Sequence, residues 1–466
     1  MIWRLDLQLL YMAHAYGIGW AAVTALCLVL LMFMRMDRAM LLGIAILLSG
    51  MIWYRPFVAL ARVLRWWVLI VLAIRGLAFA AAKARSGLTS GHAPLSLIVF
   101  SGLMLASCAW AEAPILACVL ALSLVCVQML GFVVVWSLSD DDLLLRRLCS
   151  ATLLLALLIH GVGLFVAGFA LLTGDTELRQ LTGVDRRLSG ILMNANGNGV
   201  FGALFLPLVL AAPSEYLGRL RRWRWVAVTA LVVSILLSGS RTGAGIAVLG
   251  CAVFVLYRFR VGGFLTVSTL LALGISAAIM MPGEELEGST LDEVVLRTET
   301  LYDFGGRLDQ WLLGMDYGMQ QPLAGHGWGA SKTLYGWTST EDALLRGSVR
   351  FASNLHSTHV SIFVDLGFLG LAAFWAFCGT VLWSGMRVVS APRTPANTVV
   401  VLIFAATLGL VADTFVHNGI LSAASSNSLL FWSATAIVIR HARRLRAAES
   451  GPQSSAAGGV SVALAR

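Results

Sequence analysis

Long apolar runs recur along this chain from residue 17 to residue 439. A bilayer core of roughly 30 Å needs about 20 apolar residues for each helix that crosses it, and the runs approach that length. The 466 residues are 59% hydrophobic and only 12% charged, a balance that excludes soluble globular classes of protein. The sequence therefore predicts an all-α integral membrane protein.

We predict 12 or 13 transmembrane helices, several of them short. The count before residue 95 stays open, because Arg55, Arg62 and Arg65 disagree locally with the rule that loop cations gather on the cytoplasmic side. The expected spans are 17–34, 40–53, 66–82, 95–111, 114–136, 149–172, 195–212, 226–239, 243–257, 264–281, 360–386, 398–416 and 427–439.

The formal charge of +9 arises from 33 Lys and Arg residues against 24 Asp and Glu residues. Most of these cations sit in short loops between apolar runs, which indicates membrane topology and not a nucleic-acid face. All seven cysteines lie in or at the end of apolar runs, so no disulfide framework is expected. We also expect no removable signal peptide, since the first residues lack a basic region followed by a small-residue cleavage site.

The orientation follows from a basic tail at 440–446, which we place in the cytoplasm. Alternation then puts the arginines at 219–224 inside and leaves 173–190, 240–242 and 282–358 outside. A loop as long as the last is uncommon unless it is functional or disordered, and its tryptophans favour a partly helical fold. The expected parts are N-terminal membrane helices (1–172), central membrane helices with Arg-bearing periplasmic turns (173–281), a large periplasmic loop (282–358), C-terminal membrane helices (359–440) and a disordered cytoplasmic tail (441–466).

Two short polar motifs carry arginines at the outer face. Arg186 and Arg187 precede a Gly- and Asn-rich helix entry that contains Asn194 and Asn196, and Arg241 interrupts an apolar run between small residues. An Arg at membrane depth is costly and usually has a partner or a pathway role. Its planar guanidinium can bind two phosphate oxygens at once, which suits a diphosphate. Interfacial contacts with lipid headgroups are the alternative role for all three arginines.

The long outer loop carries the third set of candidates. It contains Gly305–Trp311 and Pro322–Gly329, and it ends near His356 and His359, where the chain re-enters the membrane. Two histidines at this spacing can bind a metal, but no third ligand with suitable spacing accompanies them, so we expect no metal site. Capping a helix is the alternative role for either histidine.

Two carboxylates lie inside apolar helices: Asp365, nine residues after His356, and Asp413, four residues before His417. Such carboxylates are functional candidates by default, with the orientation of an arginine as the simpler role. No nucleophile elbow, phosphate-binding loop or dinucleotide fingerprint occurs in a suitable context.

The order of these motifs resembles that of the bacterial O-antigen ligase and O-antigen polymerase superfamily. The resemblance covers residues 184–370 and consists of Arg187 with G-x-x-x-N-x-N from Gly190, S-R-x-G from Ser240, G-R-x-x-x-W around Arg307, P-x-x-G-x-G from Pro322, and His356 eleven residues before the first Gly of L-G-x-x-G. Family members usually have Asn directly after that histidine, whereas this chain has Ser357. The spacing selects His356, with His359 as the alternative, and Asp365 takes the place of the family's carboxylate before L-G.

The resemblance implies a metal-independent, inverting glycosyltransferase of the bacterial inner membrane that needs no cofactor. It would move a glycan from undecaprenyl diphosphate to an acceptor hydroxyl on the periplasmic side. His356 would be the base, because imidazole titrates near neutral pH, and Arg187 and Arg241 would bind the donor diphosphate, helped by Arg186 and Arg307. The supporting residues would be His359, Asp365, Asn194 and Asn196.

The acceptor decides between members of this superfamily. Lipid A core would make the chain an O-antigen ligase of lipopolysaccharide synthesis, which is our leading reading. A growing glycan would make it an O-antigen or exopolysaccharide polymerase, and a Ser or Thr would make it a protein O-oligosaccharyltransferase. A secondary transporter would also have many helices and buried charges such as Arg75, but transporters usually show paired halves, and none are apparent here. The expected partners are the lipid-linked donor, the acceptor and the bilayer, without nucleic acid.

Overall fold

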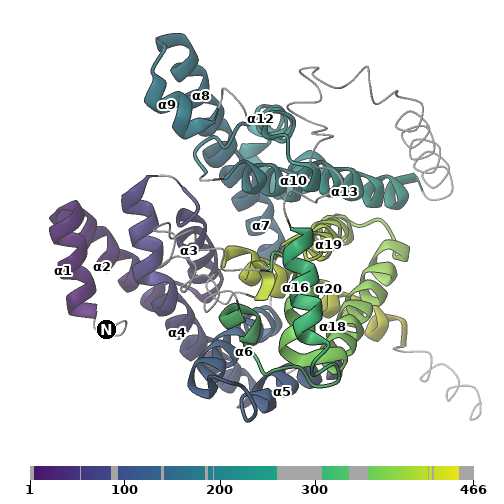
Figure 1. Cartoon of the computed structure of the whole chain (residues 1–466). Helices are drawn as coiled ribbons and strands as arrows, with labels where there is room; N and C mark the ends of the chain where they lie inside the picture. The colour runs from purple at the N-terminus through teal and green to yellow at the C-terminus, as the bar shows by residue number, and fades with distance from the viewer. Residues whose placement is uncertain are drawn as a thin grey trace, which may run out of the picture.

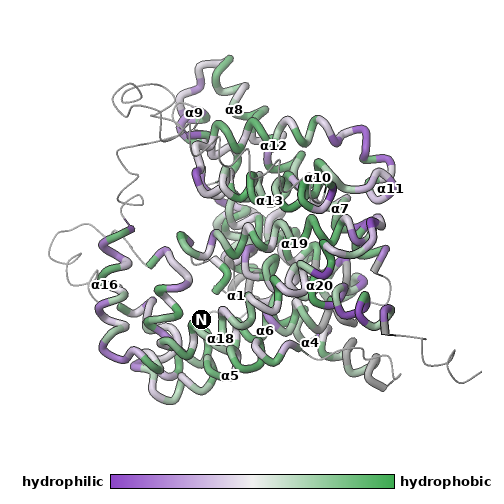
Figure 2. The backbone as a smooth tube through the Cα atoms, turned by 90° about the vertical axis from the view of Figure 1, so that its right-hand side faces the viewer, coloured by the Kyte–Doolittle hydropathy of each residue, from purple (hydrophilic) through white to green (hydrophobic). Residues whose placement is uncertain are grey.

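The chain folds as a helical bundle. The computed structural model describes residues 5–52, 54–85, 93–137, 141–183, 187–192, 194–259, 307–334, 355–417, 419–421 and 425–450. Within these ranges the residues form helices and their connections, and no strand is present apart from one isolated bridge between Ile52 and Leu192. The first helices lie at one side of the bundle, in purple (Figure 1). Apolar residues colour most of the helices, while polar residues gather at short segments such as α9 and α11 (Figure 2).

The helices occur where the apolar runs predict them. Each expected span coincides with a helix or a run of helices, except 264–281, which lies outside the described residues. The elements are α1 (Leu5–Tyr16), α2 (Ile18–Phe33), α3 (Met36–Ser49), α4 (Arg55–Arg85), α5 (Leu95–Ser107), α6 (Pro114–Ser137), α7 (Asp141–Ala156), η1 (Leu157–Gly161), α8 (Val162–Thr173), α9 (Thr176–Thr182), α10 (Ala195–Ala211), α11 (Ser214–Leu217), η2 (Gly218–Trp223), α12 (Arg224–Ser238), α13 (Arg241–Phe259), α16 (Leu308–Gly318), α18 (Thr358–Ser390), α19 (Pro395–Asp413), η5 (Gly419–Leu421) and α20 (Ser426–Ser450).

Six helical segments in the described ranges are long and apolar enough to cross a membrane. They fall in α4, α6, α7 to α8, α13, α18 and α19. The pair formed by α10 and the 214–238 segment is bent by 112° and adds at most one further span. Helices α2 and α5 have 16 and 13 residues, so each is about 20 to 24 Å long, which is less than the hydrocarbon core. A multi-pass helical membrane protein is confirmed, whereas the count of 12 or 13 stays a prediction.

Small residues bring α10 against α13 at the start of both helices. A Cβ on Gly243 would lie 2.6 Å from the carbonyl carbon of Gly199, and one on Gly199 would lie 2.4 Å from the Cβ of Ser240. About two turns farther on, Gly250 packs in the same way on Pro207. Lipid offers no hydrophobic driving force between helices, so such close backbone packing is a main source of their association. Gly199 and Gly243, one from each polar motif, therefore serve helix contact.

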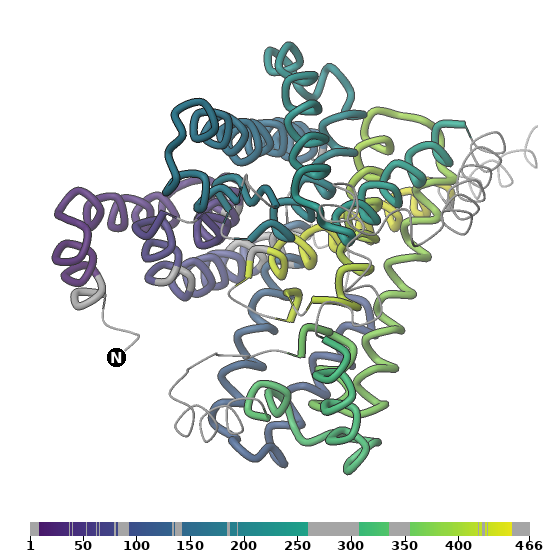
Figure 3. Tube along the Cα trace, turned by 45° about the horizontal axis from the view of Figure 1, so that its top comes forward, coloured from purple at the N-terminus to yellow at the C-terminus, as the bar shows by residue number. Residues whose placement is uncertain are grey.

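A break in α18 receives a segment of the preceding loop. Gly367 interrupts the helix with φ 63° and ψ −159°, which frees backbone groups on either side. The amides at 326 and 327 donate to the carbonyls at 364 and 365, both at 2.9 Å, and those at 368 and 369 donate to the carbonyls at 322 and 323, at 2.8 and 3.2 Å. A Cβ at Gly325 or Gly367 would lie 2.4 Å from backbone atoms of the other segment. We call Pro322–Gly329 the docking segment; it follows α16 and lies beside α18 (Figure 3).

The glycine contact predicts a difference between two neighbouring positions of α13. Gly243→Ala should lower the thermal midpoint of the purified protein by several degrees, because the added Cβ meets the backbone of α10. Gly245→Ala is the matched control, since nothing lies within 4 Å of a Cβ there. This control should leave the midpoint unchanged or raise it slightly, because Ala favours a helix over Gly by about 1 kcal/mol. Equal midpoints for the two variants, measured by tryptophan fluorescence in detergent, would contradict the contact.

Candidate functional site

Arg187 binds the turn between α12 and α13. Its Nε donates to the carbonyl oxygen of Ser238 at 2.9 Å, and its Nη2 donates to that of Gly239 at 3.2 Å. The same Nη2 donates to Oδ1 of Asn196, in the first turn of α10, at 2.5 Å. The side chain thus joins the start of α10 to the turn that leads into Arg241. The two polar motifs, about 50 residues apart in sequence, form one structure.

Three helices begin at this end of the bundle with side-chain caps. The side chain of Asn194 accepts a hydrogen bond from the amide two residues later at 2.8 Å, and that of Ser240 from the amide three residues later at 3.1 Å. Ser357 caps α18 in the same manner, at 3.4 Å. Serine is a preferred N-cap, so Ser357 suits the start of α18. Helix N-termini carry partial positive charge, which favours an anion nearby.

Arg307 precedes α16 as its N-cap and is half-buried. Burial is the main influence on the pKa of Arg307 and lowers it, while Asp413 raises it and Arg241 lowers it. Because charges act on one another strongly only at short range, two arginines from different motifs and a carboxylate from α19 lie in one electrostatic cluster. Guanidinium keeps its charge at neutral pH despite the lowered pKa, because its ordinary value is above 12.

His356 lies at the edge of this cluster, directly before the cap of α18. Its φ of 48° makes it the one non-glycine residue with positive φ in the described part of the chain. A non-glycine residue held in this region costs of order 1–3 kcal/mol, and such residues gather at functional sites. Burial lowers the pKa of His356, and Arg307 and His417 lower it further. The imidazole is therefore neutral at pH 7 and able to accept a proton.

Asp413 and His417 join the cluster as a hydrogen-bonded pair. The His417 Nδ1 lies 2.6 Å from Oδ1 of Asp413. Thr358 connects this end of α19 to the start of α18, since its amide donates to the carbonyl of Thr414 and its hydroxyl to that of His417, both at 2.9 Å. The spacing of four residues indicated the pair. Only the tertiary contact brings it next to Arg307 and His356.

His359 has a different environment. Its ring stacks on Trp375 with centroids 5.1 Å apart and planes 7° apart, and Phe374 and Phe415 also contact it. Its Nε2 shares a hydrogen bond with the hydroxyl of Thr414 at 3.0 Å. These contacts are those of a packed side chain at the junction of α18 and α19.

Asp365 supports the docking segment. It is buried in α18, and its Oδ1 accepts a hydrogen bond from the amide of Ser331 at 2.7 Å. Burial lowers the pKa of the neighbouring Lys332, and the Asp365 carboxylate opposes that shift. This carboxylate therefore holds the residues that follow the docking segment.

His326 and Tyr317, which sequence reasoning did not single out, complete the support of α16. Their rings stack with centroids 3.9 Å apart, and Nε2 of His326 lies 2.9 Å from the carbonyl oxygen of Tyr317. The Tyr317 hydroxyl donates to Glu112 at 2.8 Å, and the indole of Trp110 donates to the carbonyl of Gly325 at 3.2 Å. The turn between α5 and α6 thus holds α16, at whose start Arg307 lies. In the sequence, only the aromatic residues near the docking segment pointed to these contacts.

Some of the predicted features lie outside the described residues. Arg186 is one of them, as are most of the 282–358 loop and the tail after 450. The roles predicted for Arg186 and for the loop as a cover over the glycan therefore stay predictions.

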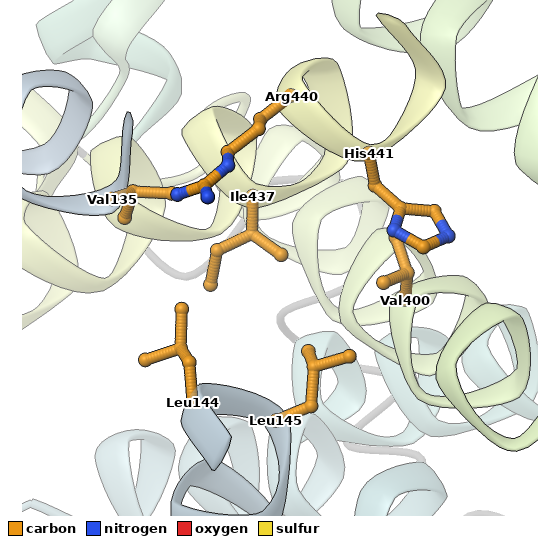
Figure 4. Close-up of a pocket in the computed structure, with 7 residues that line it drawn as sticks. All are labelled: Val135, Leu144, Leu145, Val400, Ile437, Arg440 and His441. Atoms are coloured by element: carbon orange, nitrogen blue, oxygen red, sulfur yellow. The ribbon is translucent and has the colours of Figure 1, made fainter. Parts of the chain in front are cut away.

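A separate small cavity lies between α6, α7, α19 and α20 (Figure 4). Arg440 extends toward Val135, while His441 turns toward Val400, and Nε2 of His441 lies 2.6 Å from Oδ1 of Asn397. Its volume of about 10 Å³ leaves room for at most one water molecule, so it cannot hold a substrate.

Residues 225–375 match the family model described as O-antigen ligase. A search among curated proteins found no match. The matched segment contains Arg241, Arg307, His356 and the break in α18, and Arg187 and Asp413 contact the same cluster from outside it. This match over about a third of the chain, together with the helical membrane architecture, supports a relation to the O-antigen ligase and polymerase superfamily.

Proposed function

We propose that this chain transfers a glycan from undecaprenyl diphosphate to an acceptor hydroxyl on the periplasmic side of the inner membrane. Its leading role is O-antigen ligase, with lipid A core as acceptor. The observation that carries the proposal is the position of Arg307, which interacts electrostatically with Arg241 and with His356. The three residues come from segments far apart in sequence.

The reaction needs a base for the acceptor and compensation for the leaving group. The acceptor oxygen attacks the anomeric carbon, its proton passes to the imidazole of His356, and the bond from carbon to the diphosphate oxygen breaks. The bonding pair leaves with undecaprenyl diphosphate, so negative charge grows on the phosphate oxygens. Direct displacement of this kind inverts the anomeric centre. A lowered pKa keeps His356 in the neutral form that accepts the proton.

The arginines supply the charge that a divalent cation gives in other glycosyltransferases. Arg241 and Arg307 would bind the diphosphate through paired hydrogen bonds, in a region where three capped helices begin. Arg187 is engaged with the α12–α13 turn, so it holds Arg241 in place as well as adding positive charge. We assign Asp413 to orienting Arg307 and His417.

Two of the charges that a transporter could use, Arg75 and Asp365, have structural roles instead. Arg75 donates to the carbonyls of Leu31 and Met34 at the end of α2, and Asp365 holds the docking segment. Both charges thus have structural partners. Polymerase and protein O-oligosaccharyltransferase are distinguished from ligase by the acceptor alone, since all three would use the same donor site.

The direct test supplies purified protein with a defined undecaprenyl-diphosphate-linked glycan and, separately, lipid A core, a growing glycan and a Ser-containing peptide. We expect transfer to lipid A core, at a rate that excess EDTA leaves unchanged, because arginines compensate the leaving group. Transfer only to a glycan would make the chain a polymerase. Activity lost in EDTA and restored by Mg²⁺ would contradict the arginine mechanism, and no transfer to any acceptor would contradict the proposed function.

The role of His356 can be separated from its effect on folding. His356→Gly should keep or raise the thermal midpoint, because glycine adopts a φ of 48° without strain, yet transfer should fall by roughly 10² to 10⁴. His359→Phe is the matched control: it retains an aromatic ring against Trp375, so transfer should stay within a few-fold of wild type. If His359→Phe abolishes transfer while His356→Gly does not, His359 is the base.

The charge next to His356 predicts a shift in the pH profile. Transfer should rise with pH through the pKa of His356, which lies below its usual value of about 6.5. Arg307→Gln removes a cation that lowers this pKa, so the acid limb should move to higher pH, although burial, the larger cause, remains. Arg307→Lys keeps the charge and should leave the limb in place while slowing transfer. Profiles normalised to their maxima test this, and an equal shift in both variants would contradict it.

A further inference from the structure

An open cavity lies at the end of α18 remote from His356. It is bounded by the last turns of α18 and α20 and by the turn that leads into α19, and it has a volume of about 430 Å³. The break at Gly367 folds the start of α18 back so that His359 stacks on Trp375. The cavity lining begins at Trp383, eight residues or about 12 Å farther along the helix, and shares no residue with the candidate active site. Nothing in the proposed glycan transfer uses it.

Two arginines and an exposed tryptophan line this cavity. Arg387 lies over the ring of Trp383, with 5.4 Å from its Cζ to the ring centroid, and Arg446 projects from the facing helix α20. Trp383 is 66% exposed, as expected of an aromatic side chain at a membrane interface. Glu449 also lines the cavity, so the lining carries a net charge of +1 from two arginines and one glutamate. The charge is suited to a singly charged anion.

An apolar strip on α18 leads to the cavity along one helix face. Trp375, Leu382 and Met386 are 44%, 48% and 53% exposed and lie seven and four residues apart, which places them on one face. Gly379 lies between them, with nothing within 4 Å of a Cβ, so the strip is indented at this point. An acyl chain fits such a strip, whereas a soluble anion makes no use of it.

We propose that this cavity binds the phosphate headgroup of an anionic phospholipid, with one acyl chain along the Trp375–Met386 face of α18. Arg387 and Arg446 would bind the phosphate oxygens, and Trp383 would lie at the level of the headgroup. A zwitterionic lipid would place its cation next to the same arginines and bind less well. The occupant we commit to is a bilayer lipid and not free phosphate.

The test uses the full chain, purified in an uncharged detergent and titrated with dioleoyl phosphatidylglycerol. Binding is followed by native mass spectrometry and by the thermal midpoint. The double variant Arg387→Gln/Arg446→Gln should lose about tenfold or more in affinity, since each arginine near an anionic headgroup contributes about fivefold. The control Arg221→Gln/Arg222→Gln removes two exposed arginines from η2, outside the cavity, and should bind as wild type does.

A further variant should gain affinity, which separates the proposal from a loss of folding. Glu449→Gln removes the anion from the lining and should tighten phosphatidylglycerol binding by a few-fold. Dioleoyl phosphatidylcholine should bind more weakly than phosphatidylglycerol, and millimolar inorganic phosphate should not displace the lipid. Equal affinity of the double variant and the control, no gain in Glu449→Gln, or displacement by inorganic phosphate would each overturn the proposal.

Discussion

The exchange of backbone hydrogen bonds at the break in α18 is the interaction on which the candidate site depends. Within lipid or protein, a helix that is interrupted at Gly367 must find other partners for its freed amides and carbonyls, and the docking segment supplies them. Because that segment continues directly from α16, its docking also fixes the helix that Arg307 precedes. The same helix α18 begins next to His356, so one set of backbone bonds sets the place of His356, the proposed base, relative to Arg307.

The arginines of this cluster repel one another electrostatically, and the surrounding structure must offset that repulsion. Arg241 and Arg307 repel one another, and Asp413, whose effect on Arg307 is the larger of the two, opposes that repulsion. A surplus of positive charge at the start of several helices is unfavourable in the empty protein and would become favourable once the proposed diphosphate donor is bound. The glycine contact between α10 and α13, together with the bonds from Arg187 to the α12–α13 turn, holds the arginines in place against that repulsion.

The two histidines differ in backbone conformation and in the groups that surround their rings. His359 stacks on Trp375 and shares a hydrogen bond with Thr414, so its contacts are those of a packed side chain. His356 has a strained backbone and a lowered pKa, and it faces charged groups. Strain of this kind persists only where the surrounding structure imposes it, here through the Ser357 cap and the Thr358 contacts with α19.

The sequence alone determined the positions of the helices, because an apolar run of a given length has few alternatives in lipid, and it selected Arg187, Arg241, Arg307 and His356 through motif order. The sequence did not determine the number of transmembrane spans. Hydropathy does not decide whether a short helix such as α5, or the bent pair of α10 and the 214–238 segment, crosses the membrane. Tertiary structure alone decided that Asp413 and His417 join the cluster and that Asp365 holds a loop instead. The physical reason is that a hydrogen bond between α18 and α19, or between a loop and a helix break, depends on distances that sequence spacing does not encode.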